Sequence, residues 1–404
     1  MQPMPLFLRL TYKFDDTMKK FILTHIMANL ILILVCHASP NFVSSTVSAQ
    51  TAEDASFQIR KIFQSIENNR LNTLDDSFVY SENLPTQSFY TELEIETPND
   101  GIGGGCPKSK VYFGYDRDMN KTETILMRWN DSTRTWRNYQ RELPTYTSDG
   151  NPRELNYQQW NIQKEQWNNL CREIYAYDRN GYLLQSDFQA TKAGKWFNLQ
   201  RDTYLYENGD LTQQLQYKWN AASNNWENEQ HFIYTYDAEG YQTECITQVS
   251  ENGKKNWQNH SRSSYESISD EEMLRVQFIT TEQTWTGKYW TNNRRTISIN
   301  DDLTRQAENI SQYWDEKSNQ WTNDVRRLKS YQEQGSIQSA ETFYWDEQNH
   351  AWQNASQNTY IYDENGRMHQ CIEQIWVNND CSPKWVNSTV STYGYANEGE
   401  RIDP

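Results

Sequence analysis

The residues of this chain that could perform chemistry are few, and the clearest of them are carboxylates. Asp270, Glu271 and Glu272 form an acidic run that could supply the paired carboxylates of a glycoside hydrolase. Nothing in the sequence fixes the separation that such a pair needs, so we interpret the run as a solvated turn. The sequence contains no nucleophile elbow, phosphate loop or zinc motif. We therefore predict a protein that is not an enzyme and needs no cofactor, with an extracellular polysaccharide hydrolase as the alternative.

Two further motifs could bind a cation or form a covalent bond. The segment from Asp178 to Gly181 resembles part of a calcium loop, but it is shorter than such a loop and a tight turn accounts for it. We predict no metal site. Cys371 and Cys381 flank the last predicted hairpin and are the best candidates for a disulfide. The region after residue 49 holds an odd number of cysteines, so at least one thiol stays unpaired within the chain.

Aromatic and amide side chains form the third candidate site. The chain has 16 Trp and 26 Tyr but few aliphatic residues. A flat ring offers an apolar face with a polar edge, which suits stacking against sugars. We predict a glycan-binding surface in the middle of the chain at Trp257, Asn259, Trp285, Trp290 and Asn292. The plainer interpretation is that the rings form the core of a sheet poor in aliphatic residues.

These rings belong to an internal repeat, which the spacing of Trp reveals. Nine Trp residues lie 29 to 33 residues apart, and Asn stands two residues after each of them. A second Trp often lies seven residues before the unit Trp, a Tyr pair eight and ten residues after it, and a Gly 13 or 14 residues after it. The units around Trp257 and Trp290 lack the Gly. The unit residues are Trp136, Trp167, Trp196, Trp226, Trp257, Trp290, Trp321, Trp352 and Trp385.

Each unit predicts two antiparallel strands joined by the Gly turn, with a polar loop leading to the next unit. The Gly supplies the positive φ that a three-residue hairpin loop needs at its last position. Because the unit Trp, the Asn and the Tyr pair are separated by even numbers of residues (offsets of 0, 2, 8 and 10 from the Trp), we expect them to share one face of a continuous meander. Arg residues five positions after the Trp, such as Arg172 and Arg262, should then lie on the opposite face and pair with acids. The predicted fold is all-β, a repetitive meander of two-stranded units that forms a spiral or elongated, solenoid-like sheet.

The turn motif resembles the tyrosine–aspartate (YD, or RHS-like) repeats of secreted bacterial proteins. It reads Tyr-x-Tyr-Asp-x-x-Gly at residues 175–181, 234–240 and 360–366, with a partial leading copy at residues 113–116. The resemblance covers roughly residues 111–404. It implies a spiral β-sheet, sometimes one that wraps a toxin domain, so a shell-type YD-repeat protein is a further alternative. The family repeats are shorter than those of this chain and lack the paired Trp.

The first part of the chain carries an export signal. Met18, Lys19 and Lys20 precede an apolar run from Phe21 to Val35, and small residues follow up to Ala49. This order is typical of a secretory signal peptide over residues 18–49, with Met18 as the true start. We divide the chain into residues 1–49 (upstream extension and signal), 50–105 (a short N-terminal helix and a linker) and 106–404 (the repeat array of about nine units).

Charge and hydropathy restrict the partners. The net charge is −16, and a surface of that sign repels phosphate backbones and anionic lipids. We predict no nucleic-acid partner and no membrane span once the signal is removed. The sequence thus predicts a secreted or cell-surface, non-enzymatic repeat protein. It would act as a binding or adhesion scaffold for an extracellular glycan or protein.

Overall fold

A computed structural model describes residues 59–61, 90–96, 109–116, 120–270, 275–333, 335–377 and 383–395. Apart from one helical turn, these residues form a single antiparallel sheet, which confirms the predicted all-β repetitive meander. The eighteen strands from β3 to β20 make up the repeat array and pair in chain order. The predicted signal peptide, with Met18 and Ala49, lies outside the described residues, and the domain boundaries stay predictions.

The strands alternate between the two halves of each unit. Those preceding a unit Trp, with the two leading strands, are β1 (Tyr90–Glu96), β2 (Ser109–Tyr115), β3 (Lys121–Asn130), β5 (Pro152–Asn161), β7 (Leu183–Lys192), β9 (Asp210–Asn220), β11 (Gln242–Ser250), β13 (Arg275–Trp285), β15 (Gln306–Asp315), β17 (Ile337–Asp346) and β19 (Met368–Val377). Those carrying it are β4 (Thr135–Tyr146), β6 (Gln166–Tyr177), β8 (Lys195–Glu207), β10 (Asn225–Tyr236), β12 (Trp257–Asp270), β14 (Trp290–Asp301), β16 (Gln320–Tyr331), β18 (Ala351–Tyr362) and β20 (Lys384–Tyr395).

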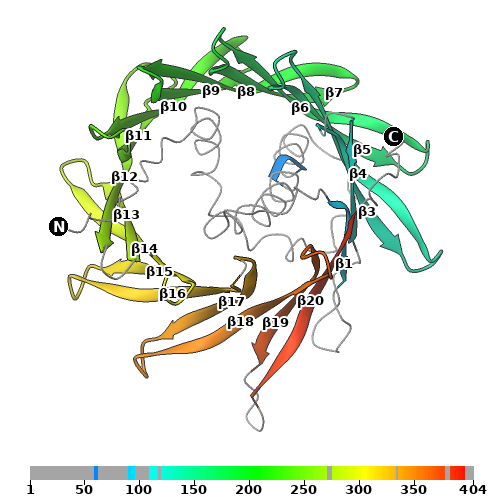
Figure 1. Cartoon of the computed structure of the whole chain (residues 1–404). Helices are drawn as coiled ribbons and strands as arrows, with labels where there is room; N and C mark the ends of the chain where they lie inside the picture. Colours follow the sequence, from blue (N-terminus) through cyan, green and yellow to red (C-terminus); the bar gives the residue numbers. More distant parts are fainter. Residues whose placement is uncertain are drawn as a thin grey trace, which may run out of the picture.

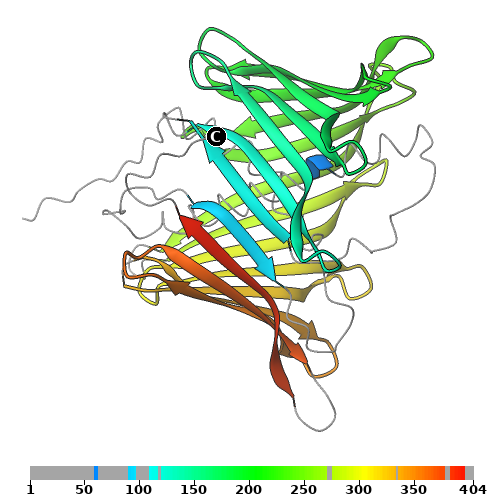
Figure 2. The same ribbon diagram turned by 90° about the vertical axis from the view of Figure 1, so that its right-hand side faces the viewer.

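Strand β1 joins the two ends of the meander. It pairs with β2 on one side and with β20 on the other, both antiparallel. Each strand of the described part therefore has a hydrogen-bonded neighbour on both sides, and the strands form a ring (Figure 1). In the perpendicular view they run obliquely (Figure 2). The sequence analysis placed residues 90–96 in a linker and did not predict this strand.

The polar loops between units bring two Trp rings together, as predicted. Trp160 pairs with Trp167 across the loop, and their rings meet edge to face with centroids 5.0 Å apart. The side chain of Asn161 closes the loop because its Oδ1 accepts backbone N–H bonds from Gln163 and Lys164, both at 3.0 Å. The same geometry recurs at Trp129–Trp136, Trp219–Trp226, Trp285–Trp290, Trp314–Trp321, Trp345–Trp352 and Trp376–Trp385.

The Tyr-Asp-x-x-Gly motif forms the turn at the opposite ends of the strands. The N–H of Asp178 donates to the Tyr182 carbonyl at 2.9 Å, and Gly181 has φ of 80°, as predicted for this position. The Asp178 carboxylate accepts the N–H groups of Asn180 and Tyr182, each at 2.8 Å. Asp237 and Asp363 accept the corresponding pairs of N–H groups in their own turns. The motif's Asp is therefore used by the turn itself.

The prediction that all marked positions share one face is wrong, because every Trp-bearing strand contains a β-bulge. In β6, Asn169 faces Gln158 while Cys171 faces Tyr157, so Leu170 is an extra residue. An equivalent register shift follows the Asn in each of the nine units. One extra residue exchanges the two faces for the rest of the strand. Trp and Asn therefore lie on one face, and the Tyr pair lies on the other.

The face that carries the Tyr pair is the inner one. The helical turn Ile59–Lys61 lies inside the ring of strands (Figure 1), and Ile59 packs in a cluster with Tyr157, Cys171, Phe188 and other inner residues. The predicted N-terminal helix is observed at these three residues; the rest of the segment lies outside the described part. Within the described residues, no helix has the length and apolar character needed to cross a membrane.

Candidate functional site

The outer face carries one contact module that recurs from unit to unit. In β6 the guanidinium of Arg172 donates from Nε to Gln189 at 2.9 Å, and Gln189 in turn donates to Asn198 at 2.9 Å. The same guanidinium lies 4.3 Å from the centroid of the Trp196 ring, and its Nη1 atom lies 3.6 Å from Oε2 of Glu154. Arg, Trp and Asn thus form one network on one face, which corrects the expectation that these Arg residues lie opposite the Trp. Their predicted pairing with acids is confirmed.

This stacking recurs in six successive pairs of units. A cation five residues after one unit Trp covers the Trp ring of the next unit, at centroid distances of 4.3 to 5.2 Å for the arginines. In the fourth unit His231 takes the place of Arg and stacks on Trp257 at 5.3 Å. Successive modules lie two strands apart, or about 10 Å. The stacked pairs are Arg141–Trp167, Arg172–Trp196, Arg201–Trp226, His231–Trp257, Arg262–Trp290 and Arg295–Trp321.

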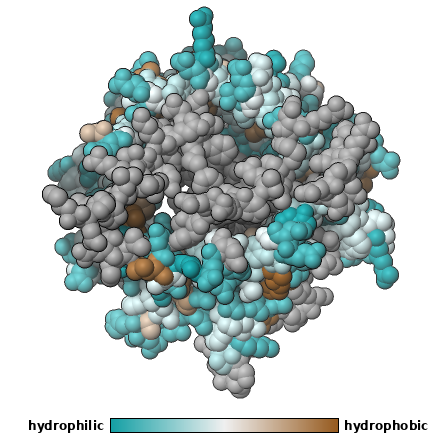
Figure 3. Space-filling view, in the orientation of Figure 1, coloured by the Kyte–Doolittle hydropathy of each residue, from teal (hydrophilic) through white to brown (hydrophobic). Residues whose placement is uncertain are grey.

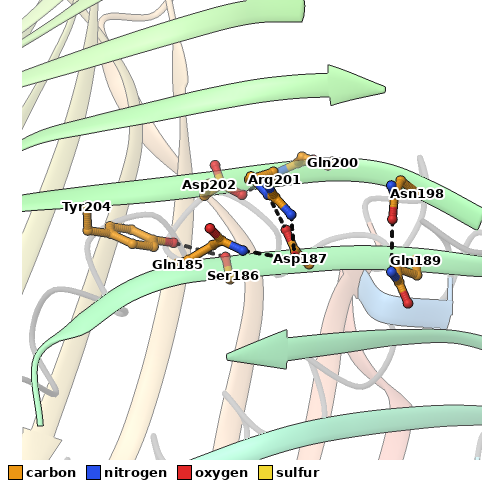
Figure 4. Close-up of polar contacts among 9 residues, drawn as sticks. All are labelled: Gln185, Ser186, Asp187, Gln189, Asn198, Gln200, Arg201, Asp202 and Tyr204. Atoms are coloured by element: carbon orange, nitrogen blue, oxygen red, sulfur yellow. Dashed lines mark hydrogen bonds and ion pairs between the residues drawn. The ribbon is translucent and has the colours of Figure 1, made fainter. Parts of the chain in front are cut away.

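A view of β7 and β8 shows how the two faces divide the polar side chains (Figure 4). On the outer face Arg201 binds Asp187 through two bonds of 2.6 and 3.0 Å, beside the Gln189–Asn198 pair. On the inner face the hydroxyl groups of Ser186 and Tyr204 lie 3.3 Å apart. Consecutive residues of one strand therefore place their side chains on opposite faces of the sheet.

The five residues of the predicted glycan surface fall in two neighbouring modules of the outer face. Trp285 and Trp290 meet edge to face at 5.0 Å, and Arg262 stacks on Trp290 at 5.2 Å. Gln283 accepts a bond from Arg262 at 2.8 Å and donates to Asn292 at 2.8 Å. Strand β12, which carries Arg262, also carries Trp257 and Asn259, and Gln248 donates to Asn259 at 2.9 Å.

The loop above the Trp285–Trp290 pair departs from the other Trp loops. It is two residues shorter than most of them and four shorter than the Trp376–Trp385 loop, and it holds Gly287 with φ of 93°. Tyr289 follows, 63% exposed, although its backbone is fixed by two hydrogen bonds with Thr286. An exposed Tyr therefore directly precedes a half-buried Trp in the chain. Sequence reasoning did not single out Tyr289; the shortened loop of the degenerate unit was the available signal.

The inner face holds a second cluster, which the sequence analysis missed. Glu142, Glu173 and Asp202 each stand six residues after a unit Trp in three consecutive units, and all three are buried. Glu142 binds Lys121 at 2.8 Å, while Glu173 accepts hydroxyl bonds from Tyr157 at 3.2 Å and from Tyr175 at 2.8 Å. We call these three carboxylates the inner acidic trough. The signal in the sequence was the acid at the same position of three units.

Arg60 from the helical turn lies against this trough. Its Nε atom is 2.8 Å from Oε1 of Glu173, and its guanidinium lies 4.9 Å from the centroid of the Phe188 ring. Burial lowers the pKa of Arg60, but the combined Coulombic attraction of Glu173 and weaker neighbours outweighs it and leaves the pKa raised, so Arg60 stays charged. Burial raises the pKa of Tyr157 and Tyr175 well above the ordinary value, and the neighbouring Glu173 raises both further.

Asp202 shares the trough without a direct ion pair in the described part of the chain. Gln200 donates to it at 2.7 Å, and Gln214 and Gln216 donate at 3.1 and 3.3 Å. Burial raises the pKa of Asp202, and these three hydrogen bonds and the nearby Arg60 oppose that shift. The carboxylate is thus held in a buried amide cage.

The other predicted site residues are described only in part. Asp270 ends β12, and Glu271 and Glu272 lie outside the described residues. Cys171, Cys245 and Cys371 are thiols on the inner face, and burial raises the pKa of Cys245 to about 11 and that of Cys371 to about 12. Cys381 lies outside the described residues, so the Cys371–Cys381 disulfide stays a prediction.

Comparisons with known proteins do not assign the chain to a family. No protein-family model and no curated protein matches it. Among solved structures, a porin-like protein from Bacteroides uniformis is 9% identical, with a TM-score of 0.30, and the alignment covers 77% of this chain and 99% of that one. A Bacteroides fragilis protein of unknown function is 11% identical, with a TM-score of 0.22, over 39% of this chain and 88% of that one. The TcdB2-TccC3 structure without its hypervariable C-terminal region is 10% identical, with a TM-score of 0.14, over 70% and 21% respectively. Similarities this low carry no functional argument, and the YD-repeat resemblance stays an expectation.

Proposed function

We propose that this chain is an exported, non-enzymatic β-repeat scaffold that binds an extracellular glycan through the outer face of β12–β14. The observation that supports this most is the outer-face network of the Trp285–Trp290 pair with Arg262 and Asn292. The exposed Tyr289 directly precedes Trp290 in the chain. Exposed ring faces beside fixed amide and guanidinium groups offer both stacking and hydrogen bonds to sugar hydroxyl groups.

The repetition of the outer face supports a polymeric ligand. The modules recur about every 10 Å, so a chain of similar sugars could meet similar side chains in successive units. The net charge of −16 favours a neutral or basic glycan over an acidic one. In the view down the ring, the described residues are mostly hydrophilic, as expected of a surface in contact with water (Figure 3).

The experiment is a glycan array probed with residues 50–404, followed by two matched variants. Tyr289→Ala removes the exposed ring that precedes Trp290 in the chain. Tyr241→Ala removes a ring of similar exposure, 61%, at the opposite ends of the strands. We expect binding that falls at least tenfold in Tyr289→Ala and is unchanged in Tyr241→Ala. An array without signal, or equal loss in both variants, would contradict the proposal.

A shell-type function is the second candidate, since a different observation favours it. The ring of strands encloses Ile59, which is 1% exposed among inner residues of β5–β8. A shell would bind its cargo on that inner face, so the two candidates differ in which face of the sheet meets the ligand.

A further inference from the structure

We propose that the inner acidic trough is a peptide-binding site that selects arginine, and that Ile59–Lys61 is its tethered ligand. This inference concerns the inner face and does not depend on the proposed glycan function. The chemical class of the ligand is a short peptide with an aliphatic residue followed by Arg. The chain's own segment is the occupant seen in the structure.

The first argument is the match between the site and a guanidinium. Glu173 supplies a carboxylate 2.8 Å from Nε of Arg60, and the Phe188 ring supplies a π face 4.9 Å from the guanidinium carbon. A planar delocalised cation uses both, whereas an ammonium group is more strongly hydrated and stacks less well. The hydroxyl groups of Tyr157 and Tyr175 fix the two oxygens of Glu173, so the acceptor is oriented before any ligand arrives.

The second argument is that the trough departs from the repeat. The position six residues after the unit Trp carries an acid in the first three units only; the later units carry Phe232, Ser263, Thr296, Arg327, Asn358 and Ser391 there. A requirement of the sheet itself would apply to every unit. Three buried acids in the alternate strands β4, β6 and β8 therefore point to a local role, and the cation bound to the middle one, Glu173, comes from outside the repeat array.

The third argument is that the apolar part of the site contacts the residue that precedes the Arg. Ile59 is 1% exposed and packs with Tyr157, Cys171, Phe188, Ala190 and Leu199 from four strands. The neighbouring Lys61 is exposed. The helical turn makes few contacts with the inner face of the sheet. Its covalent attachment to the chain gives it a high effective concentration at the site, which strengthens its binding. A free peptide of the same sequence should therefore bind only when the tethered copy is displaced.

The test uses the full exported chain with the tethered copy disabled by Ile59→Asp and Arg60→Glu. A fluorescent peptide of residues 55–64 is added, and binding is followed by anisotropy. We expect saturable binding to this variant, with an affinity at least tenfold higher than for the wild-type chain, whose site is occupied. A peptide in which Lys replaces Arg should bind at least fivefold more weakly, and one in which Gln replaces Arg should not bind.

Two protein controls complete the design. Glu173→Gln, added to the disabled chain, should abolish binding, whereas Glu308→Gln, which removes an ion pair with Arg326 on the outer face, should leave it unchanged. Because the Lys and Gln peptides leave the protein unaltered, they test selectivity even where Glu173→Gln fails to fold. Absence of peptide binding to the disabled chain, or equal affinity for the Arg and Lys peptides, would overturn the proposal. A silent glycan array would leave it unaffected.

Discussion

The outer and inner faces of the sheet differ in how faithfully they follow the repeat. On the outer face, Trp, Asn and a cation recur in unit after unit and bind one another. On the inner face, the Tyr pair near the Gly turns recurs. The hydroxyl group of the second Tyr often donates a hydrogen bond to a backbone carbonyl of the preceding unit, as Tyr236 does to Leu211 at 2.8 Å. The residue type six positions after the unit Trp, where the trough acids stand, differs in contrast from unit to unit. Repeated contacts hold the sheet together, and the departures from them are where a specific site can be built.

The largest expected effect comes from breaking the inner trough. Glu173→Gln leaves Arg60 charged beside a neutral partner, and removing one member of a buried pair costs about 3–5 kcal/mol. The side chains of Arg60 and Glu173 are 21% and 6% exposed, so we expect the lower end of that range. The measurement is urea unfolding followed by intrinsic fluorescence. An outer-face control, Glu308→Gln, should cost no more than about 1 kcal/mol; equal losses would remove the contrast between the faces.

A single substitution in the stacked network of the outer face should cost less stability. Trp226→Ala removes the edge-to-face contact with Trp219 at 5.0 Å and the stack with Arg201 at 4.7 Å. We expect a loss of about 2 kcal/mol, since the ring is only half buried and each contact contributes about 1 kcal/mol. Trp226→Phe should recover part of it. A loss above that of Glu173→Gln would reverse the ranking of the two faces.

The pH dependence of stability should show the cost of burying Asp202. Because burial raises the folded-state pKa of Asp202, the folded chain binds this proton more tightly than the unfolded chain. The resulting stabilisation is fully present below the unfolded pKa of about 3.9 and is lost as the pH rises through the folded-state pKa. Asp202→Asn stays neutral, so we expect it to match the wild type near pH 4 and to be more stable by about 1 kcal/mol at pH 7. Unfolding curves at both pH values check this; a less stable variant at pH 7 would show that the amide cage favours the charged form.

The smallest effect concerns the one outer position where histidine replaces arginine. Burial lowers the pKa of His231, so the ring is neutral at pH 7. Both of its nitrogen atoms lie near amide oxygens, of Gln248 at 3.2 Å and Gln213 at 3.0 Å, which could equally accept from a guanidinium. His231→Arg should replace the neutral imidazole on Trp257 with a guanidinium, add a cation–π contact and stabilise the chain by about 0.5 kcal/mol. Thermal unfolding measures it, and a destabilised variant would mean that the fourth unit does not tolerate the repeat's own residue.

Much of the fold could be predicted from the sequence because its signals are local. The paired Trp rings predicted the loop contacts, and the Gly of Tyr-Asp-x-x-Gly predicted the turn. The division into faces was not predicted, since the extra residue of the bulge is of no constant type: it is Leu170 in one unit and Asp324 in another. Counting even positions along a strand therefore assigned the Tyr pair to the wrong face.

The candidate sites were predictable to different degrees. The five predicted outer residues lie in one region because they sit in adjacent hairpins, which the repeat itself dictated. Arg60 could not be linked to Glu173 by any periodic pattern, because the two residues are far apart in the sequence and only the curvature of the sheet brings them together.

The position of the bulge can be tested with a single pair of introduced cysteines in a chain whose native cysteines are replaced by Ser. Asn354→Cys and Ser356→Cys lie two residues apart, on either side of the register shift in β18. A maleimide that carries a long polyethylene glycol chain should modify the cysteine at position 354 rapidly from outside the ring and the one at position 356 slowly from within. Equal rates at both positions, as an unbroken strand with both side chains on one face would give, would contradict the account.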